Sequence, residues 1–147
     1  MDREDLGALL ARAARRLVDA ERPLLAAHGL SMWDYVVLSH LAREPAGTQL
    51  ALARAIGYDK TRLIGLLDAL ERDGLVARTP DPADRRARIV SLTPAGATRH
   101  AAAQGDVRAM EDELLSDLSP TARRRLLATL TELTGPVTPG SARPASG

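Results

Sequence analysis

Several residue types are missing or scarce in this chain of 147 residues, and each absence excludes a class of function. There is no cysteine, which excludes disulfides, thiolate catalysis, cysteine-based zinc sites and thiol redox sensing. Phenylalanine is absent and aromatic residues make up only 2%, so leucine, alanine, valine and isoleucine must form the core. No apolar run approaches membrane-spanning length, and the charged start of the chain does not resemble a signal peptide. We therefore expect a cytoplasmic protein with no membrane partner.

The charge is nearly balanced, with 20 basic and 19 acidic residues and a formal net charge of +1. Bulk charge therefore predicts neither nucleic-acid nor membrane binding, and such a function must rest on local placement. His28, His40 and His100 do not have metal-ligand spacing, so we expect no metal and no cofactor. The sequence offers no nucleophile triad, no glycine-rich phosphate loop and no pair of carboxylates in a probable cleft, so an enzyme is not expected.

The residues that are present favour helices. Hydrophobic residues make up 45% and charged residues 27%, which is typical of a single globular domain. Leucines and alanines at three- and four-residue steps predict a long first helix that ends near Gly29, followed by a well-buried helix over residues 32–42. A short helix over 49–55, a tight turn at 56–58 and a helix capped by Asp59 and ended by Gly74 come next.

A β-hairpin is predicted after these helices. Residues 75–79 and 88–92 have strand composition, and the prolines and aspartates between them initiate turns. Thr93-Pro94 and Ser119-Pro120 then mark the starts of two further helices, because a capping hydroxyl followed by proline favours the first helical turn. Residues 136–147 have linker composition and are expected to form a disordered tail.

The order helix, turn, helix, hairpin over residues 48–92 predicts a winged helix-turn-helix. The second helix of such a unit can enter the DNA major groove with its N-terminal residues at base edges, and here these are Lys60, Thr61 and Arg62. Gly65 on the same exposed side would let the backbone approach DNA closely. An arginine at the tip of a thin hairpin suits the narrow minor groove, and the residues available there are Arg85, Arg86 and Arg88.

Each of these features also has a purely structural interpretation. The polar residues at the start of the second helix are equally compatible with a solvated face. The hairpin arginines can belong to a soluble loop in which Asp81 and Asp84 pair with them. Acidic residues nearly cancel the basic charge of the region. The argument for DNA therefore rests on the order of the elements.

The residues resemble the MarR family of bacterial transcriptional regulators. The run from Asp81 to Gly96, DPADRRARIVSLTPAG, is similar to the wing signature of that family, and LERDGLVAR at 70–78 is similar to the end of its recognition helix. The resemblance implies a mainly α fold with a small β-hairpin wing. It also implies that Arg86 is the minor-groove arginine, that Asp84 braces the wing by a charged contact, and that residues 60–62 lie where family members read bases.

The resemblance further implies a homodimer on a palindromic operator, with half-sites roughly 34–36 Å apart. Residues 1–30 and 94–135 would form the dimerisation helices, and residues 31–93 the DNA-binding lobe. The residues agree with a dimer, because apolar stripes near both termini exceed what one small winged domain can cover.

A small aromatic or anionic effector is also implied, since many family members bind one between the dimer helices and the DNA-binding lobe. His28, Trp33, Tyr35 and His40 lie near that place in the sequence. Trp33 is alternatively a core residue and His40 an interior, hydrogen-bonded histidine.

The sequence thus predicts a sequence-specific DNA-binding regulator, a ligand-responsive repressor that acts as a homodimer. The alternative is a winged-helix module for protein–protein contact without DNA binding, although that function would not need a basic wing tip.

Overall fold

The computed structural model describes residues 2–135, and these form a mainly helical protein with one small sheet. The elements in chain order are α1 (Leu6–Ala27), α2 (Met32–Arg43), β1 (Gly47–Thr48), α3 (Gln49–Ile56), α4 (Lys60–Arg72), β2 (Val76–Pro80), β3 (Arg88–Leu92), α5 (Pro94–Leu114) and α6 (Pro120–Thr134). The winged helix-turn-helix predicted from the sequence is confirmed. The tail predicted at 136–147 lies outside the described residues. No helix within residues 2–135 is long and apolar enough to cross a membrane.

Side-chain caps determine where most of the helices begin. The N-cap side chain accepts a hydrogen bond from a backbone N–H in the first turn of α2, α3, α4, α5 and α6. Such a bond satisfies a backbone donor that has no partner inside the helix. The five capping residues are Ser31, Thr48, Asp59, Thr93 and Ser119, and the last three are caps predicted above from the sequence.

The sheet has three antiparallel strands in the order β1-β3-β2. Strands β2 and β3 form the predicted hairpin, with Val76 opposite Leu92 and Pro80 opposite Arg88. Strand β1 adds to the other edge of β3, with Gly47 opposite Val90. Sequence patterning missed β1, because two residues are too few to show an alternation of apolar and polar side chains.

The junction between the hairpin and α5 explains part of the wing signature. The Thr93 hydroxyl donates to the carbonyl of Gly74 at 2.6 Å and accepts the N–H of Gly96 at 3.0 Å. A Cβ at Gly96 would lie 2.0 Å from the carbonyl oxygen of Leu75. Only glycine fits where α5 starts directly against the hairpin, so this junction holds the wing to the long helix.

The core lies between α2, α3, α4, α5 and the sheet. Its buried residues are Leu25, Leu30, Val37, Leu38, Leu52, Ala53, Leu63, Leu67, Leu70, Leu75, Val76, Val90, Ala103 and Val107. Helix α2 is less buried than predicted, since only Val37 and Leu38 of its side chains are fully covered. Trp33 is 39% exposed, so it is not a core residue of the single chain.

His100 on α5 is the one buried polar side chain among the described residues, at 5% exposure. Its Nε2 lies 3.0 Å from the hydroxyl of Ser39, and its ring stacks on Tyr35 with centroids 5.4 Å apart. Burial lowers the pKa of His100 below its ordinary value, and the cationic side chains of Arg108 and Arg43 lower that pKa further. The imidazole is therefore held neutral in the folded chain.

The buried imidazole makes stability depend on pH. The unfolded chain takes up a proton at the ordinary histidine pKa of about 6.5, whereas the folded chain resists it. We expect the free energy of unfolding to fall as the pH drops from about 7.5 to about 5.5. His100→Gln should make this dependence shallower in urea unfolding followed by circular dichroism. Equal slopes in the parent and the variant would contradict the assignment, because the other histidines contribute to both.

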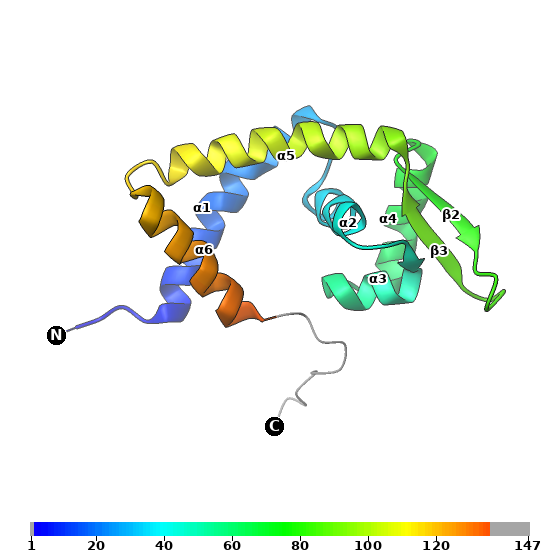
Figure 1. Ribbon diagram of the computed structural model, residues 1–147, viewed down its shortest axis with the longest axis horizontal. Coiled ribbons are helices and arrows are strands. Elements are labelled where there is room, and N and C mark those ends of the chain that lie inside the picture. Colours follow the sequence, from blue (N-terminus) through cyan, green and yellow to red (C-terminus); the bar gives the residue numbers. More distant parts are fainter. Residues whose placement is uncertain (1, 136–147) are drawn as a thin grey trace, which may run out of the picture.

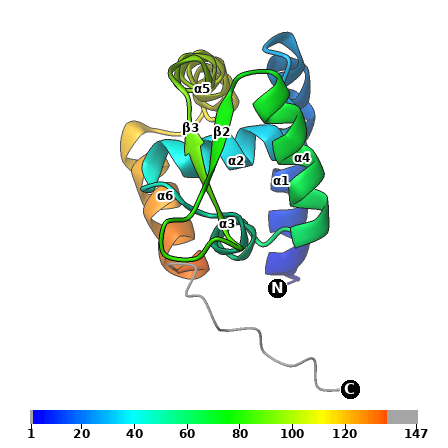
Figure 2. The same ribbon diagram turned by 90° about the vertical axis from the view of Figure 1, so that its right-hand side faces the viewer.

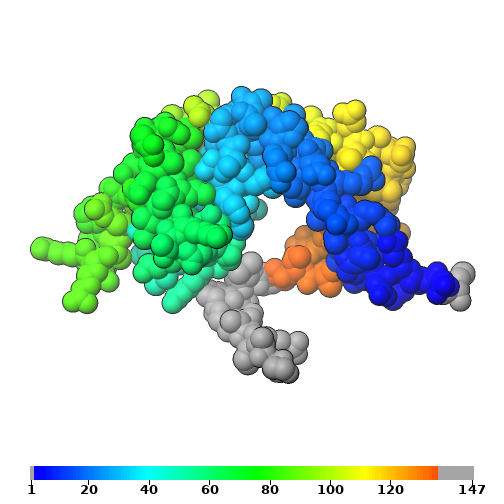
Figure 3. Space-filling model, turned by 180° about the vertical axis from the view of Figure 1, so that it is seen from behind, coloured from blue at the N-terminus to red at the C-terminus, as the bar shows by residue number. Residues whose placement is uncertain are grey.

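The chain has the shape of an arch with two ends (Figure 1). Helix α5 runs along the top and joins a lobe built from α2, α3, α4 and the hairpin to an arm built from α1, α6 and the end of α5. A space-filling view from behind shows a hollow between the lobe and the arm (Figure 3). Seven of the ten exposed large apolar side chains in the described residues lie on the arm, namely Leu6, Leu9, Leu10, Leu118, Leu126, Leu127 and Leu133.

Candidate nucleic-acid interface

The start of α4 and the tip of the hairpin lie at the same end of the lobe (Figure 2). Gly57 makes this possible, because its φ of 66° ends α3 in the left-handed region and turns the chain toward α4. Asp59 then caps α4 by accepting the N–H of Arg62 at 2.9 Å. Lys60, Thr61 and Arg62 are all exposed on the first turn, and the space around Gly65 is open.

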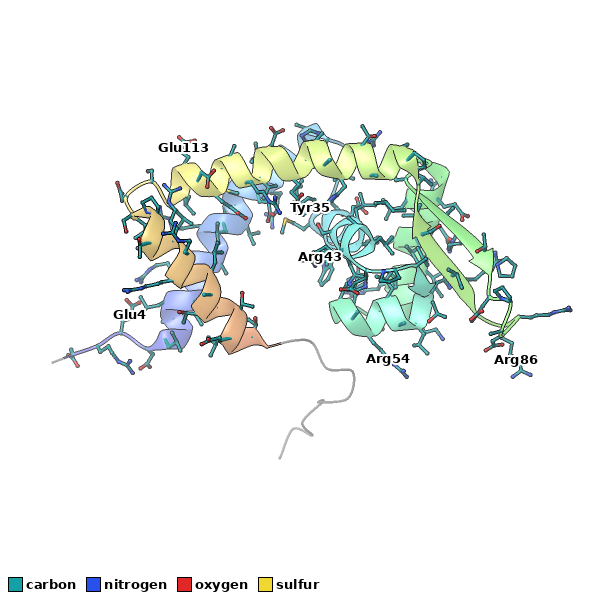
Figure 4. The ribbon with its side chains drawn as sticks, in the orientation of Figure 1. Glu4, Tyr35, Arg43, Arg54, Arg86 and Glu113 are labelled. Atoms are coloured by element: carbon teal, nitrogen blue, oxygen red, sulfur yellow. The ribbon has the colours of Figure 1, made fainter. Side chains whose placement is uncertain are left out.

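Two aspartates shape the wing tip through backbone hydrogen bonds. Asp84 accepts the N–H of Arg86 at 3.0 Å, and Asp81 accepts the N–H of Ala83 at 2.9 Å. The charged contact that the resemblance implied for Asp84 is not among the ion pairs of the described residues. Within residues 2–135, none of the three wing arginines, Arg85, Arg86 and Arg88, forms an ion pair. Their guanidinium groups are exposed, and Arg86 extends away from the tip (Figure 4).

A groove of about 330 Å³ lies between the wing and the start of α4. It brings Lys60 of the recognition helix together with Arg86 and Arg88 of the wing. Thr48, Gln49 and Leu50 at the start of α3 also line it, and sequence patterning did not single these out. Arg54 on α3 was missed as well, and it points to the same side of the lobe as Arg86 (Figure 4).

Arg78 on β2 ties the wing to both helices of the helix-turn-helix. Its guanidinium is 14% exposed and donates to Asp68 at 2.5 Å and to Glu71 at 3.3 Å on α4. It also donates to the side-chain oxygen of Gln49 on α3 at 3.2 Å. The hydrogen bond from Arg78 holds the pKa of the Glu71 carboxyl below its ordinary value. These contacts set the position of the hairpin relative to α4.

The sequence contains a pattern from which the role of Arg78 could be predicted. Val76 and Arg78 are two residues apart in β2, so both side chains lie on the same face of the strand. An arginine on a partly buried face needs anionic partners. Asp68 and Glu71 are three residues apart and therefore adjacent on α4.

Replacing Arg78 tests whether this tie positions the wing. Arg78→Met keeps the length of the side chain but removes the ion pairs with Asp68 and Glu71 and the hydrogen bond to Gln49, and ion pairs with exposed carboxylates contribute little to stability. We expect the variant to remain folded and its affinity for DNA to fall about ten-fold, measured by fluorescence anisotropy. Arg72→Met on the exposed side of α4 is the matched control and should change affinity far less. Equal affinities of both variants would contradict a positioning role.

The four residues predicted to line an effector pocket are not brought together within the single chain. Trp33 packs on Tyr58 in the turn before α4, with ring centroids 4.3 Å apart. Tyr35 stacks on His100, and His28 Nε2 lies 2.6 Å from the Asp106 carboxylate. His40 lines a cavity of about 600 Å³ between α2, β1 and α3, and the other three residues are not part of the lining of that cavity.

This cavity combines apolar walls with a cation. Leu41, Ala51 and Leu52 form apolar walls, and the cation Arg43 and the carboxylate Glu44 line the cavity together with His40. Tyr35 and Arg43 lie on the side of α2 that faces the hollow of the arch (Figure 4). Burial raises the pKa of Tyr35 above its ordinary value, so its hydroxyl stays protonated at neutral pH.

Comparisons with known proteins extend over most of the chain. A family model described as MarR family matches residues 28–87. A MarR-family regulator from Rhodococcus sp. RHA1 has a crystal structure that superposes with a TM-score of 0.81 at 30% identity, covering 90% of this chain and 94% of that chain. The chain belongs to the MarR family of transcriptional regulators.

Other members of the MarR family show a similar degree of likeness. CouR, a transcriptional repressor solved bound to a 23-mer DNA duplex, has a TM-score of 0.80 at 32% identity, covering 89% of this chain and 93% of CouR. CouR from Rhodococcus jostii RHA1 has also been solved bound to p-coumaroyl-CoA. The transcriptional activatory protein BadR of Rhodopseudomonas palustris is 36% identical over 117 residues, which is 76% of this chain. The match spans only 62% of the length of BadR.

Proposed function

We propose that this MarR-family chain is a homodimer that binds a palindromic operator and represses transcription until an effector releases it. The observation that carries the proposal is the groove in which Lys60 meets Arg86 and Arg88. Exposed cations from two different elements line it at one end of the lobe, and although Asp81 and Asp84 line it too, the wing arginines form no ion pair with a carboxylate of the described residues. Such an arrangement suits a polyanion with regularly spaced charges, and the phosphates of a DNA duplex have that spacing.

The two halves of the interface would have different tasks. The first turn of α4 enters the major groove, where Lys60, Thr61 and Arg62 reach base edges and Gly65 allows close approach. The wing lies along the adjacent minor groove and inserts Arg86, with Arg85 and Arg88 on the phosphates beside it. This division follows the general rule that base contacts specify a sequence while phosphate contacts position the protein.

The arm would form the interface with the second copy of the chain. Residues 1–30 and 94–135 carry the exposed leucines of α1 and α6, and an apolar surface of that extent favours association. A two-fold axis through these helices would present two lobes to one face of DNA, so that the operator repeats as a palindrome.

The effector would be a small anion with an apolar, aromatic body. The cavity beside His40 and Arg43 offers a cation next to apolar walls, and it opens near the hollow into which the arm of a partner would fit. p-Coumaroyl-CoA is bound by CouR, and 6-hydroxynicotinic acid regulates DNA binding by BpsR of Bordetella bronchiseptica. A ligand acts on DNA binding only if it prefers one spacing of the two lobes over another.

A gel-shift experiment on the region upstream of the coding sequence tests the regulator. We expect a retarded band at low salt that weakens steeply as salt rises, since binding releases counterions from DNA. An unlabelled duplex of random sequence should compete poorly. Absence of any band at low salt would refute DNA binding and leave the protein–protein module as the better hypothesis.

Two further measurements test the sign of regulation and the effector. A promoter fused to a reporter should be more active when the gene is deleted, because a bound dimer occludes polymerase. Lower activity would make the protein an activator, as BadR is described. The DNA complex is titrated with 6-hydroxynicotinic acid and with p-coumaroyl-CoA, and a ligand that fits the cavity should release the DNA. Arg43→Ala should raise the ligand concentration that is required for this release.

A further inference from the structure

Helix α4 carries an exposed isoleucine where stability alone favours a polar residue. Ile64 is 39% exposed and lies on the second turn of the helix, while the neighbouring Leu63 and Leu67 are fully buried. A β-branched side chain lowers helix propensity, and an exposed apolar surface contributes nothing to folding. A residue that breaks local rules without a packing reason is a candidate for function.

The other exposed apolar side chains have explanations that Ile64 lacks. Those on α1, α6 and the loop before α6 lie on the proposed dimer arm, and Trp33 packs on Tyr58. In the lobe only Leu50 and Ile64 remain among the described residues. Ile64 is not among the apolar side chains packed against the core. It keeps about two fifths of its surface exposed in the free protein.

The direction of Ile64 follows from its helical position. Residues on an α-helix are about 100° apart, so Lys60, Ile64 and Asp68 follow one another along one side of α4. Asp68 and Lys60 mark which side this is, because Asp68 binds Arg78 of β2 and Lys60 lines the groove beside the wing. Ile64 thus lies one turn above Lys60, on the side of the recognition helix that borders this groove.

We propose that Ile64 reads the C5-methyl group of a thymine in the major groove of the operator. The groove beside Ile64 is lined by the cations Lys60, Arg86 and Arg88 and by the carboxylates Asp81 and Asp84, and its cations suit phosphates and base acceptors. A neutral branched side chain among them has no electrostatic partner on DNA. The thymine methyl is the apolar group that normal DNA exposes in the major groove. Gly65 next to Ile64 has open space around it, which lets the helix approach the base edges.

This inference rests on the proposed function, and it adds a particular base preference. The test uses a duplex selected by the parent protein from a pool with a randomised central region. Each thymine of that duplex is then replaced in turn by uracil, which removes only the methyl group. We expect one symmetric pair of positions at which uracil weakens binding, by about four-fold per half-site, corresponding to loss of one buried methyl.

Variants of Ile64 assign that effect to the side chain. Ile64→Ala should bind thymine and uracil duplexes equally at the sensitive position, and Ile64→Val should keep part of the difference. Leu50→Ala removes an equally exposed aliphatic side chain from the same lobe and should keep the whole difference. Thermal unfolding should show that all three variants remain folded.

The outcomes separate this inference from the proposed function. Selected DNA that binds tightly but shows no thymine–uracil difference would overturn the role of Ile64 and leave the regulator intact. The same result follows if Ile64→Ala keeps the full difference. Failure to select any duplex at low salt would overturn both. A 5-methylcytosine at the sensitive position that restores binding would support the methyl contact directly.

Discussion

Arg86→Ala is expected to weaken DNA binding about ten- to a hundred-fold, on operator and unrelated DNA alike. The wing tip places Arg86 away from the body of the lobe (Figure 4), with no carboxylate partner in the described chain. An arginine inserted into a narrow minor groove contributes through charge and shape, and the expected range corresponds to about 0.7–1.4 kcal/mol for each wing. A dimer would lose two such contacts at once. Fluorescence anisotropy with both duplexes at one salt concentration provides the measurement.

Substitutions on α4 should give a different pattern from the wing variant. Lys60→Ala and Arg62→Ala are expected to reduce binding to the operator more than binding to random DNA, so that the preference between them shrinks. Arg22→Ala on the exposed side of α1 removes the same charge far from the groove and serves as the control. If Arg86, Lys60 and Arg62 variants lost operator and random binding in equal proportion, the division between positioning and reading would be wrong.

Leu127→Glu is expected to convert the protein from a dimer to a monomer. Leu127 on α6 is 60% exposed. A carboxylate buried in an apolar interface loses its hydration, which is energetically costly. In a two-fold interface the substitution occurs twice, so a loss of about 2 kcal/mol or more per side is expected. Analytical ultracentrifugation measures the mass. DNA binding should fall with it, because a monomer contacts only one half-site.

The matched control introduces the same charge elsewhere. Thr98→Glu places a carboxylate on the exposed side of α5 near the lobe, away from the leucines of α1 and α6, and should leave the mass unchanged. A Leu127→Glu protein that still sediments as a dimer would show that α6 does not form the interface. A parent protein that sediments as a monomer at micromolar concentration would refute the dimer itself.

Local signals in the sequence account for most of the fold. The capping residues Thr93 and Ser119 are each followed by proline, and both helices begin there. Gly57 and Gly74 end α3 and α4 with positive φ values, as expected where a side chain would be strained. These features depend on residues close together in the chain. They are therefore readable without knowledge of the tertiary structure.

The parts that were missed depend on contacts between distant residues. Strand β1 exists because Gly47 and Thr48 pair with β3, more than 40 residues later in the chain. Arg78 acquires its role only when α3 and α4 bring Gln49, Asp68 and Glu71 around it. The expected burial of α2 failed for a similar reason. Helix α2 borders the hollow of the arch (Figure 3), and residues 2–135 do not fill that space.

The candidate effector residues show the same limit. Proximity in the sequence placed His28, Trp33, Tyr35 and His40 together, yet His28 caps the end of α1 and α2 directs the other three to different neighbours. Helical residues two and five positions apart do not share a face. Arg43 is three residues after His40, and both line the same cavity.

The contact between Trp33 and Tyr58 gives this protein a built-in optical reporter. Trp33 is the only tryptophan, and its ring touches the turn from which α4 begins. Its emission therefore responds to movement at the base of the recognition helix, free of background from any other indole. Stopped-flow recording of that emission would time how fast the lobe rearranges on meeting DNA or a ligand, without attaching a dye.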